Sequence, residues 1–203
     1  MGQISDVGAL RKILPEPNDL TLAKIRDHLD EQSRAFIARS PFLLLSTCCE
    51  DGTLEVSPKG DRPGFVGVED VRTVLLPDRA GNNIAIGLTN IIRNPNVGMI
   101  FLCPGTGETL RIAGRATMHD DSDMCERLAT RGQPAKLVIR ISVDRAYFHC
   151  ARSLLRAQLW KPDSWPEPVR VSFGKIIAEV KNGDKKTADD IDAFVREGYR
   201  TGL

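Results

Sequence analysis

The chain has 203 residues, of which 41% are hydrophobic, and this supports one well-filled core with appendages. Its 28 lysines and arginines face 27 aspartates and glutamates, and the net charge of +1 argues against a nucleic-acid binder, which usually carries a basic excess. No apolar run reaches the roughly 20 residues that span a bilayer, and residues 1–14 lack the pattern of a signal peptide. The five cysteines form no Cys-x-x-Cys motif. They favour buried thiols in a reducing compartment, so we expect a cytoplasmic protein without a membrane partner.

Residues 20–38 place apolar side chains at helical spacing and predict a helix that ends before Pro41. Short apolar or alternating runs follow, separated by turn signals such as Asp51-Gly52. We expect strands over residues 42–47, 54–57, 65–68, 71–76, 97–102, 109–116, 137–143 and 146–149.

Only short helices are expected among and after these strands, over residues 84–93, 121–130, 151–160 and 188–199. Because the strands do not alternate with long helices, the pattern argues against a doubly wound sheet. It predicts a mainly β protein, an antiparallel barrel of six or seven strands with flanking α-helices. We expect a single domain over residues 1–203, with a core at about 42–150 and a C-terminal extension from 151.

The segment from Asp78 to Asn83 lies between a predicted strand and a predicted helix. A helix begins with unpaired N–H groups and a partial positive charge, which suits a phosphate group. Arg79 adds a bidentate donor, Gly81 permits close approach, and Asn82 and Asn83 offer amides. The alternative is an ordinary turn in which Asn83 caps the helix.

The segment Val56-Ser57-Pro58-Lys59-Gly60-Asp61 follows an alternating strand. Proline restricts the chain, glycine frees it, and Lys59 supplies a point charge, which suits the polar edge of a planar ring. The alternative is a solvated surface turn, since ordinary turns have the same composition.

The remaining candidate residues are less specific. Arg111 and Arg115 share one face of a predicted strand and face either a cofactor or solvent. Trp160 either packs the tail against the barrel or forms a lid over a planar ligand. The three histidines have no ligand-like spacing with the cysteines, so we expect no metal site. No nucleophile elbow or P-loop occurs, and the catalytic residues stay unknown.

Several motifs occur in an order and spacing that resemble the FMN-binding split-barrel proteins related to pyridoxamine 5′-phosphate oxidase. The resemblance is closest to a subgroup with SPKGD and PDRxGNN motifs, and the following segments carry it: Val56–Asp61, Gly64–Val66, Leu75–Asn83, Asn94–Gly98, Pro104–Arg111 and His149–Trp160. Their order and spacing match over roughly half the chain, which makes the match far more specific than either loop alone.

The resemblance implies a split β-barrel that forms a homodimer, with one FMN (flavin mononucleotide) in each of two grooves at the interface. It implies that the phosphate sits by Arg79–Asn83, that the ring sits by Ser57 and Lys59, and that Arg156–Trp160 of the second subunit contributes. The cofactor-binding set that we expect is Val56, Ser57, Pro58, Lys59, Asp78, Arg79, Gly81, Asn82, Asn83, Glu108, Arg111, Arg156 and Trp160.

Two departures from the family pattern affect this prediction. Related proteins often have a basic residue where Ile84 stands, which weakens the expected phosphate clamp by one cation. The arginine-rich C-terminal segment with which pyridoxamine 5′-phosphate oxidase reads its substrate has no match, so the substrate is not implied.

The function that we expect is that of an FMN-dependent oxidoreductase acting on a small molecule, in which Lys59 tunes the flavin. The alternatives are a non-catalytic FMN carrier or sensor, and a split-barrel protein that uses a deazaflavin or haem.

Overall fold

The computed structural model describes residues 2–181 and 184–201. The chain divides into two compact units, Met1–Arg79 with Ile84–Trp160, and Ala80–Asn83 with Lys161–Leu203. In the part of the chain that the structure describes, no helix is long and apolar enough to cross a membrane.

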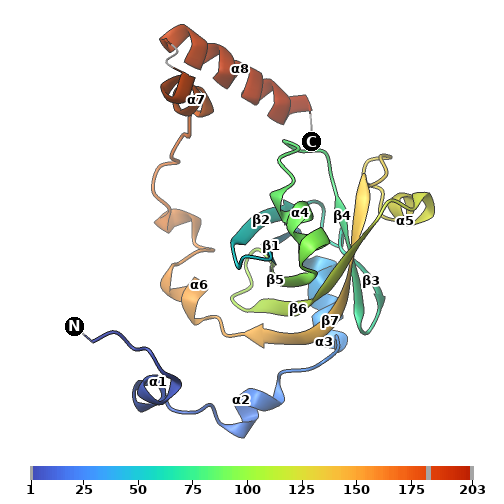
Figure 1. Cartoon of the computed structure of the whole chain (residues 1–203), viewed down its shortest axis with the longest axis vertical. Helices are drawn as coiled ribbons and strands as arrows, with labels where there is room; N and C mark the ends of the chain where they lie inside the picture. The colour runs from blue at the N-terminus through green and yellow to red at the C-terminus, as the bar shows by residue number, and fades with distance from the viewer. Residues whose placement is uncertain (1, 182–183, 202–203) are drawn as a thin grey trace. The chain divides into compact units, whose positions relative to one another are not determined.

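The first unit is built on one seven-stranded antiparallel sheet, in the order β2-β1-β5-β6-β7-β4-β3 (Figure 1). Its strands are β1 Phe42–Cys48, β2 Leu54–Gly60, β3 Gly67–Asp70, β4 Thr73–Asp78, β5 Asn96–Leu102, β6 Thr109–His119 and β7 Leu137–His149. The sheet keeps two edges, β2 and β3, and does not close on itself. The predicted fold class, an antiparallel split barrel with flanking helices, is confirmed.

Alternation of side chains along the strands produces the core. In β1, Leu43 and Leu45 are buried, whereas Leu44 on the other face is half-buried. The inward residues of the other strands complete one cluster around Phe101 and Leu110, both of which are fully buried. A bulge between Ala113 and Gly114 adjusts the long β6–β7 ladder.

Helices flank this sheet in the first unit. They are α1 Val7–Ile13, α2 Asp19–Ala23, α3 Glu31–Arg39, α4 Ile86–Arg93, α5 Ser122–Arg127 and α6 Arg152–Arg156. Asp30 caps α3 and Asp121 caps α5, each by accepting a backbone N–H bond in the first turn.

The predicted helix over residues 20–38 is wrong as one element, because it is two helices. The residues between α2 and α3 leave the helix so that the Arg26 backbone can pair with Ala146 of β7, N–H to carbonyl at 2.9 and 2.7 Å. The two strands predicted over 137–149 form the single strand β7.

The second unit contains the 3₁₀ turn Pro162–Ser164 and the helices α7 Phe173–Lys181 and α8 Lys185–Thr201. Gly174 lets the two helices approach closely, because a Cβ there would lie 1.9 Å from the Ala188 carbonyl oxygen. Asp192 of α8 accepts bonds from the Gly174 N–H and the Ser172 hydroxyl. Helix α7 was not predicted from the sequence.

Candidate functional site

The ends of β2 and β4 meet across the split of the sheet, although the two strands are not neighbours in it. Lys59 Nζ lies 2.6 Å from Asp78 Oδ1, and Arg79 Nε lies 3.1 Å from Asp61 Oδ2. The structure therefore brings together the two segments that the sequence analysis singled out. It also pairs each predicted cation with a carboxylate of the other segment.

The predicted loop at Ser57–Gly60 is wrong, because these residues belong to strand β2. Pro58 is compatible with the strand because β2 is an edge strand and needs no second partner there. Side chains alternate along β2: Ser57 and Lys59 are half-buried, whereas Val56 and Pro58 are exposed on the opposite face. The predicted cofactor residues of β2 are thus divided between two faces.

Arg79 is the centre of a small polar network. Besides its ion pair with Asp61, its Nη2 donates to the Leu128 carbonyl oxygen at 2.6 Å. Its Nη1 is buried and finds no hydrogen-bond partner within the described residues. A buried donor without an acceptor costs about 1–3 kcal/mol, so this guanidinium has unused binding capacity.

Asp61 is held by several donors at once. Its carboxylate accepts bonds from the Arg62 backbone N–H at 2.8 Å and the Thr130 hydroxyl at 3.2 Å, besides Arg79. Burial by itself raises the pKa of this carboxyl group, but the Arg62 N–H, the Arg79 charge and the Thr130 hydroxyl outweigh burial and lower the pKa. Asp61 is therefore ionised at neutral pH.

The first turn of α4 carries no side-chain cap. Its N-cap residue is Ala85, which has a left-handed backbone with φ of 55°, and Asn83 is also left-handed with φ of 58°. The capping role considered for Asn83 is therefore wrong, and the helix begins two residues later than expected. A helix start without a capping side chain keeps its N–H groups available for an anion.

Ser57 lies beside this helix start. A Cβ atom on Gly87, the second residue of α4, would lie 3.9 Å from Ser57 Oγ and 3.5 Å from Thr47 Oγ1. Thr47 is itself buried and accepts a bond from Asn90 Nδ2 at 3.2 Å. Two hydroxyl groups thus stand at a helix start that a glycine keeps open.

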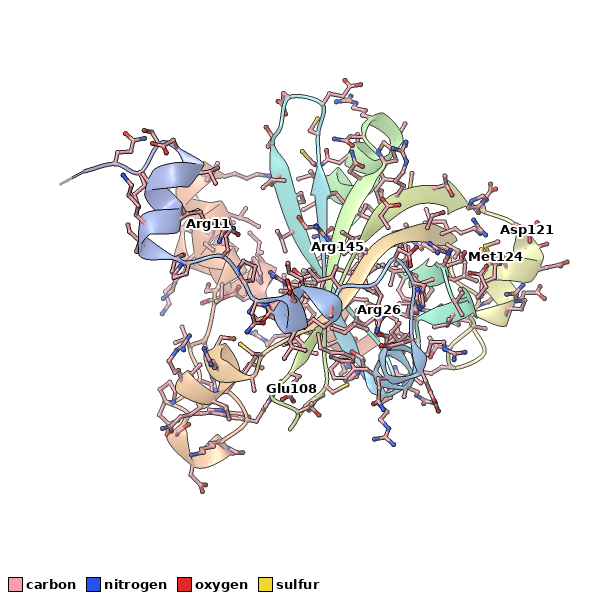
Figure 2. The ribbon with its side chains drawn as sticks, turned by 90° about the horizontal axis from the view of Figure 1, so that it is seen from below. Arg11, Arg26, Glu108, Asp121, Met124 and Arg145 are labelled. Atoms are coloured by element: carbon pink, nitrogen blue, oxygen red, sulfur yellow. The ribbon has the colours of Figure 1, made fainter. Side chains whose placement is uncertain are left out.

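The other predicted site residues occupy different places. Arg111 Nη1 lies 3.4 Å from the Tyr147 hydroxyl oxygen, on the face of the sheet that also carries Val56. Glu108 lies at the β5–β6 turn, at the opposite end of β6 from Asp121 and Met124 (Figure 2). Arg156 is exposed at the end of α6. No single site within the first unit collects all of them.

Trp160 is attached to the β5–β6 turn of its own chain. Its indole Nε1 donates to the Thr106 carbonyl oxygen at 2.8 Å. Gly107 lets the segment around Ala151, which precedes Trp160, come close to the β5–β6 turn. A Cβ atom at Gly107 would lie only 2.7 Å from the Ala151 Cβ. This contact is the packing role considered for Trp160, while its role at a cofactor stays a prediction.

The residues Gly81, Asn82 and Asn83 belong to the segment that groups with the second unit, and their predicted roles stay predictions. For metals, the search was limited to residues 2–181 and 184–201. Within those ranges no group of three or more His, Cys, Asp or Glu side chains could hold an ion.

The sequence analysis missed an arginine-lined cleft beside Asp61. The cleft joins the β2–β3 turn, Arg79, the last residue of α5, Arg127, and the following loop with Thr130 and Arg131. Local sequence contains only a weak signal for it, the turn dipeptide Arg131-Gly132, because the three segments meet through the folding of the sheet.

Residues 29–150 match the family model described as pyridoxamine 5′-phosphate oxidase, which covers more than half of the chain. No curated protein sequence gives a significant match.

Similar solved structures include HupZ of Group A Streptococcus, with 17% identity, a TM-score of 0.49 and coverage of 59% of this chain and 93% of HupZ. A putative pyridoxamine 5′-phosphate oxidase from Lactobacillus delbrueckii has 20% identity and a TM-score of 0.47, covering 60% of this chain and 95% of that protein. General Stress Protein 26 of Bacillus anthracis has 18% identity and a TM-score of 0.44, covering 56% and 88%. At these values the structures add nothing about function.

Proposed function

We propose that this chain, which belongs to the pyridoxamine 5′-phosphate oxidase family, is an FMN-binding flavoprotein and an FMN-dependent oxidoreductase. The observation that carries the proposal is the open start of α4 beside Ser57, which lies two residues before Lys59 of the Lys59–Asp78 pair, on the same face of β2. The residues present suit a group that combines a phosphate with a polar ring.

The phosphate is assigned to the first turn of α4. The uncapped N–H groups and the helix dipole favour an anion there, and the Ser57 hydroxyl can donate to a phosphate oxygen. Ile84 provides no cation at this point, so most of the attraction would come from backbone dipoles and hydroxyls. The roles of Asn82 and Asn83 belong to the same proposal.

The ring is assigned to the neighbourhood of Lys59. The Lys59 side chain is about one-fifth exposed and its ammonium group is paired with Asp78, so the pair presents a nearly neutral but strongly polar edge. When bound, FMN supplies the hydride-accepting chemistry. The residues of the chain would bind the ring, orient it and limit the access of water, and none is assigned as a general acid or base.

The family membership also supports a homodimer with FMN at its interface. On the outer face of the sheet, Val56 is 54% exposed and lies in a row with Ser46, Gly98 and Ala113. Small side chains in one row leave room for a second copy.

The test is a titration of flavin-free full-length protein with FMN, followed by flavin fluorescence. Saturable binding of one FMN per chain supports the proposal, and no binding refutes it. Ser57→Ala should raise the Kd about two- to tenfold through loss of one hydrogen bond, whereas Ser122→Ala, at an exposed serine on α5, should leave it unchanged.

A second measurement separates an oxidoreductase from a carrier. Reduction of the bound flavin by a nicotinamide cofactor, with reoxidation by oxygen or another acceptor, supports the enzyme. Tight FMN binding without turnover for any donor tested would favour the carrier, and binding of a deazaflavin or haem in place of FMN would overturn the cofactor assignment.

A further inference from the structure

The cleft beside Asp61 has the make-up of an anion site. It has a volume of about 260 Å³ and lies between the turn after β2 and the loop after α5. Its charged lining consists of four arginines and one aspartate, namely Arg62, Arg79, Arg127, Arg131 and Asp61.

Most of this positive charge is not neutralised by the protein. Asp61 is paired with Arg79. Across residues 2–181 and 184–201, none of the other three arginines forms an ion pair with a carboxylate. The lining therefore has a formal excess of three positive charges, which attracts anions to the cleft.

A second observation points to a missing ligand atom. Arg79 lines the cleft, and its buried Nη1 has no acceptor among the described residues, while its other two nitrogens are satisfied. Such orphaned donors are rare in folded proteins. This guanidinium therefore has one donor that the described residues do not use.

In the loop after α5, Arg131 adopts an unfavourable backbone conformation. Thr130 and Gln133 exchange backbone hydrogen bonds at 3.0 and 2.8 Å, which closes a two-residue turn over Arg131 and Gly132. Both turn residues are left-handed, with φ of 50° and 76°. Glycine or asparagine would adopt this conformation at the first turn position with less strain, so Arg131 destabilises the turn. Its position in the cleft lining gives a reason for an arginine there.

The size of the cleft limits what it can bind. Sites for whole drug-sized ligands usually start at about 300 Å³, so the cleft is too small for a flavin mononucleotide. Phe65 and Leu128 add apolar surface to the lining. An oxyanion on a small organic body therefore fits both the chemistry and the volume.

We propose that this cleft is a binding site for the oxyanion, phosphate or carboxylate, of a small molecule, separate from the FMN site. Arg127 and Arg131 attract the anion and contact it by bidentate hydrogen bonds, and Arg62 and Arg79 complete the arginine lining. The proposal does not depend on flavin binding, since the cleft and its charges belong to the chain itself.

The test uses the full chain, labelled with ¹⁵N and saturated with FMN, and titrates it with inorganic phosphate at constant ionic strength. We expect saturable shifts of the backbone amides of Arg62, Thr130 and Gly132. A parallel titration with acetate assigns the ligand class: a tighter response to phosphate indicates a phosphate compound, and a tighter response to acetate a carboxylate. No saturable shift with either ion would overturn the proposal.

Variants at exposed arginines keep the fold intact. Arg127→Gln and Arg131→Gln should each weaken anion binding at least fivefold. Arg93→Gln is the matched control, because Arg93 interacts electrostatically with Asp51 at the other end of β2, and it should leave the affinity unchanged. Equal weakening by all three variants would show non-specific screening and would refute the site.

A competition experiment separates this site from the cofactor site. If FMN displaces phosphate from the flavin-free protein and abolishes the shifts at Thr130 and Gly132, the ion reports the cofactor site and the separate cleft is wrong. If FMN does not bind at all, the phosphate titration still tests the cleft, so the two proposals fail independently.

Discussion

Asp61 couples three segments of the chain through one carboxylate. It accepts bonds from Arg62, Arg79 and Thr130, which belong to the β2–β3 turn, the end of β4 and the loop after α5. These hydrogen bonds and charges favour the ionised form, so the folded protein holds the pKa of Asp61 below its usual value. The carboxylate therefore contributes to folding only while it is charged.

This contribution predicts a defined acid sensitivity. A lowered pKa gives stability that is fully present above the unfolded pKa of about 3.9 and is lost as the pH falls through the folded pKa. We expect the free energy of unfolding of the wild-type protein, measured with urea between pH 6 and pH 2.5, to fall below about pH 4. Asp61→Asn should show a smaller fall over the same pH range. An unchanged slope in the variant would show that Asp61 is not coupled to folding.

The Asp61–Arg79 pair also predicts a stability coupling. The two side chains are 12% and 24% exposed, so the loss of either partner leaves a poorly solvated charge. Arg79→Ala and Asp61→Ala should each lower the free energy of unfolding by about 2 kcal/mol, and the double variant should lower it by clearly less than the sum. Additive effects in this cycle, measured by chemical denaturation, would contradict a direct pair.

The sequence was informative about which residues form the candidate site and less so about their partners. Order and spacing of the motifs predicted that the segments around Lys59 and Arg79 belong together. They did not predict that Asp78 and Asp61 neutralise these cations, because the two ion pairs depend on the three-dimensional approach of β2 and β4 across the split. The arginine cleft was missed for the same reason.

Most strands were predictable from the sequence, but the break in the N-terminal helical region was not. Alternation of side chains marked the strands to within a few residues. Helical spacing was equally clear at residues 20–38, yet the backbone of Arg26 pairs with Ala146 and divides the helix. Helix α7 was not predicted from its local sequence. It packs through Gly174 against α8, which lies further along the sequence. In both regions, contacts with distant parts of the chain determine the structure, and the local sequence does not show these contacts.

The variant Gly87→Ala, in α4, tests stability and the proposed cofactor binding separately. A Cβ at this position meets Thr47 and Ser57 at ordinary contact distances of 3.5 Å and more, so Gly87→Ala fits the fold. We expect the free energy of unfolding to rise by about 0.5 kcal/mol because alanine is the better helix former. The methyl group should also crowd the first turn of α4 and raise the Kd for FMN severalfold in a fluorescence titration.

The two effects of Gly87→Ala have opposite signs, which excludes a trivial explanation by misfolding. Gly198→Ala, in α8, is a suitable comparison, since a Cβ there would meet no atom of the described residues within 4 Å. A stabilised Gly87→Ala protein with unchanged FMN affinity would contradict the assignment of the phosphate to α4.

At the scale of the whole molecule, the proposed dimer predicts a link between assembly and cofactor binding. Light scattering should give twice the chain mass of 22.4 kDa. Val56→Glu places a charge on the proposed interface, so it should shift the protein toward monomer and release flavin in parallel. Val169→Glu, at a residue that is 87% exposed in the second unit, is the control and should change neither. A flavin-loaded monomer would refute the interface.

The strand order has a consequence for how the protein is made. Strand β4 follows β2 closely in sequence, but it is held in the sheet by β7, with Thr73 opposite Ser142. The β3–β4 hairpin of a nascent chain therefore cannot join the rest of the sheet until β7 has been synthesised. The long separation of these partners raises the contact order and slows the final step. The ion pairs between β2 and β4 would therefore form only after β7 has joined the sheet.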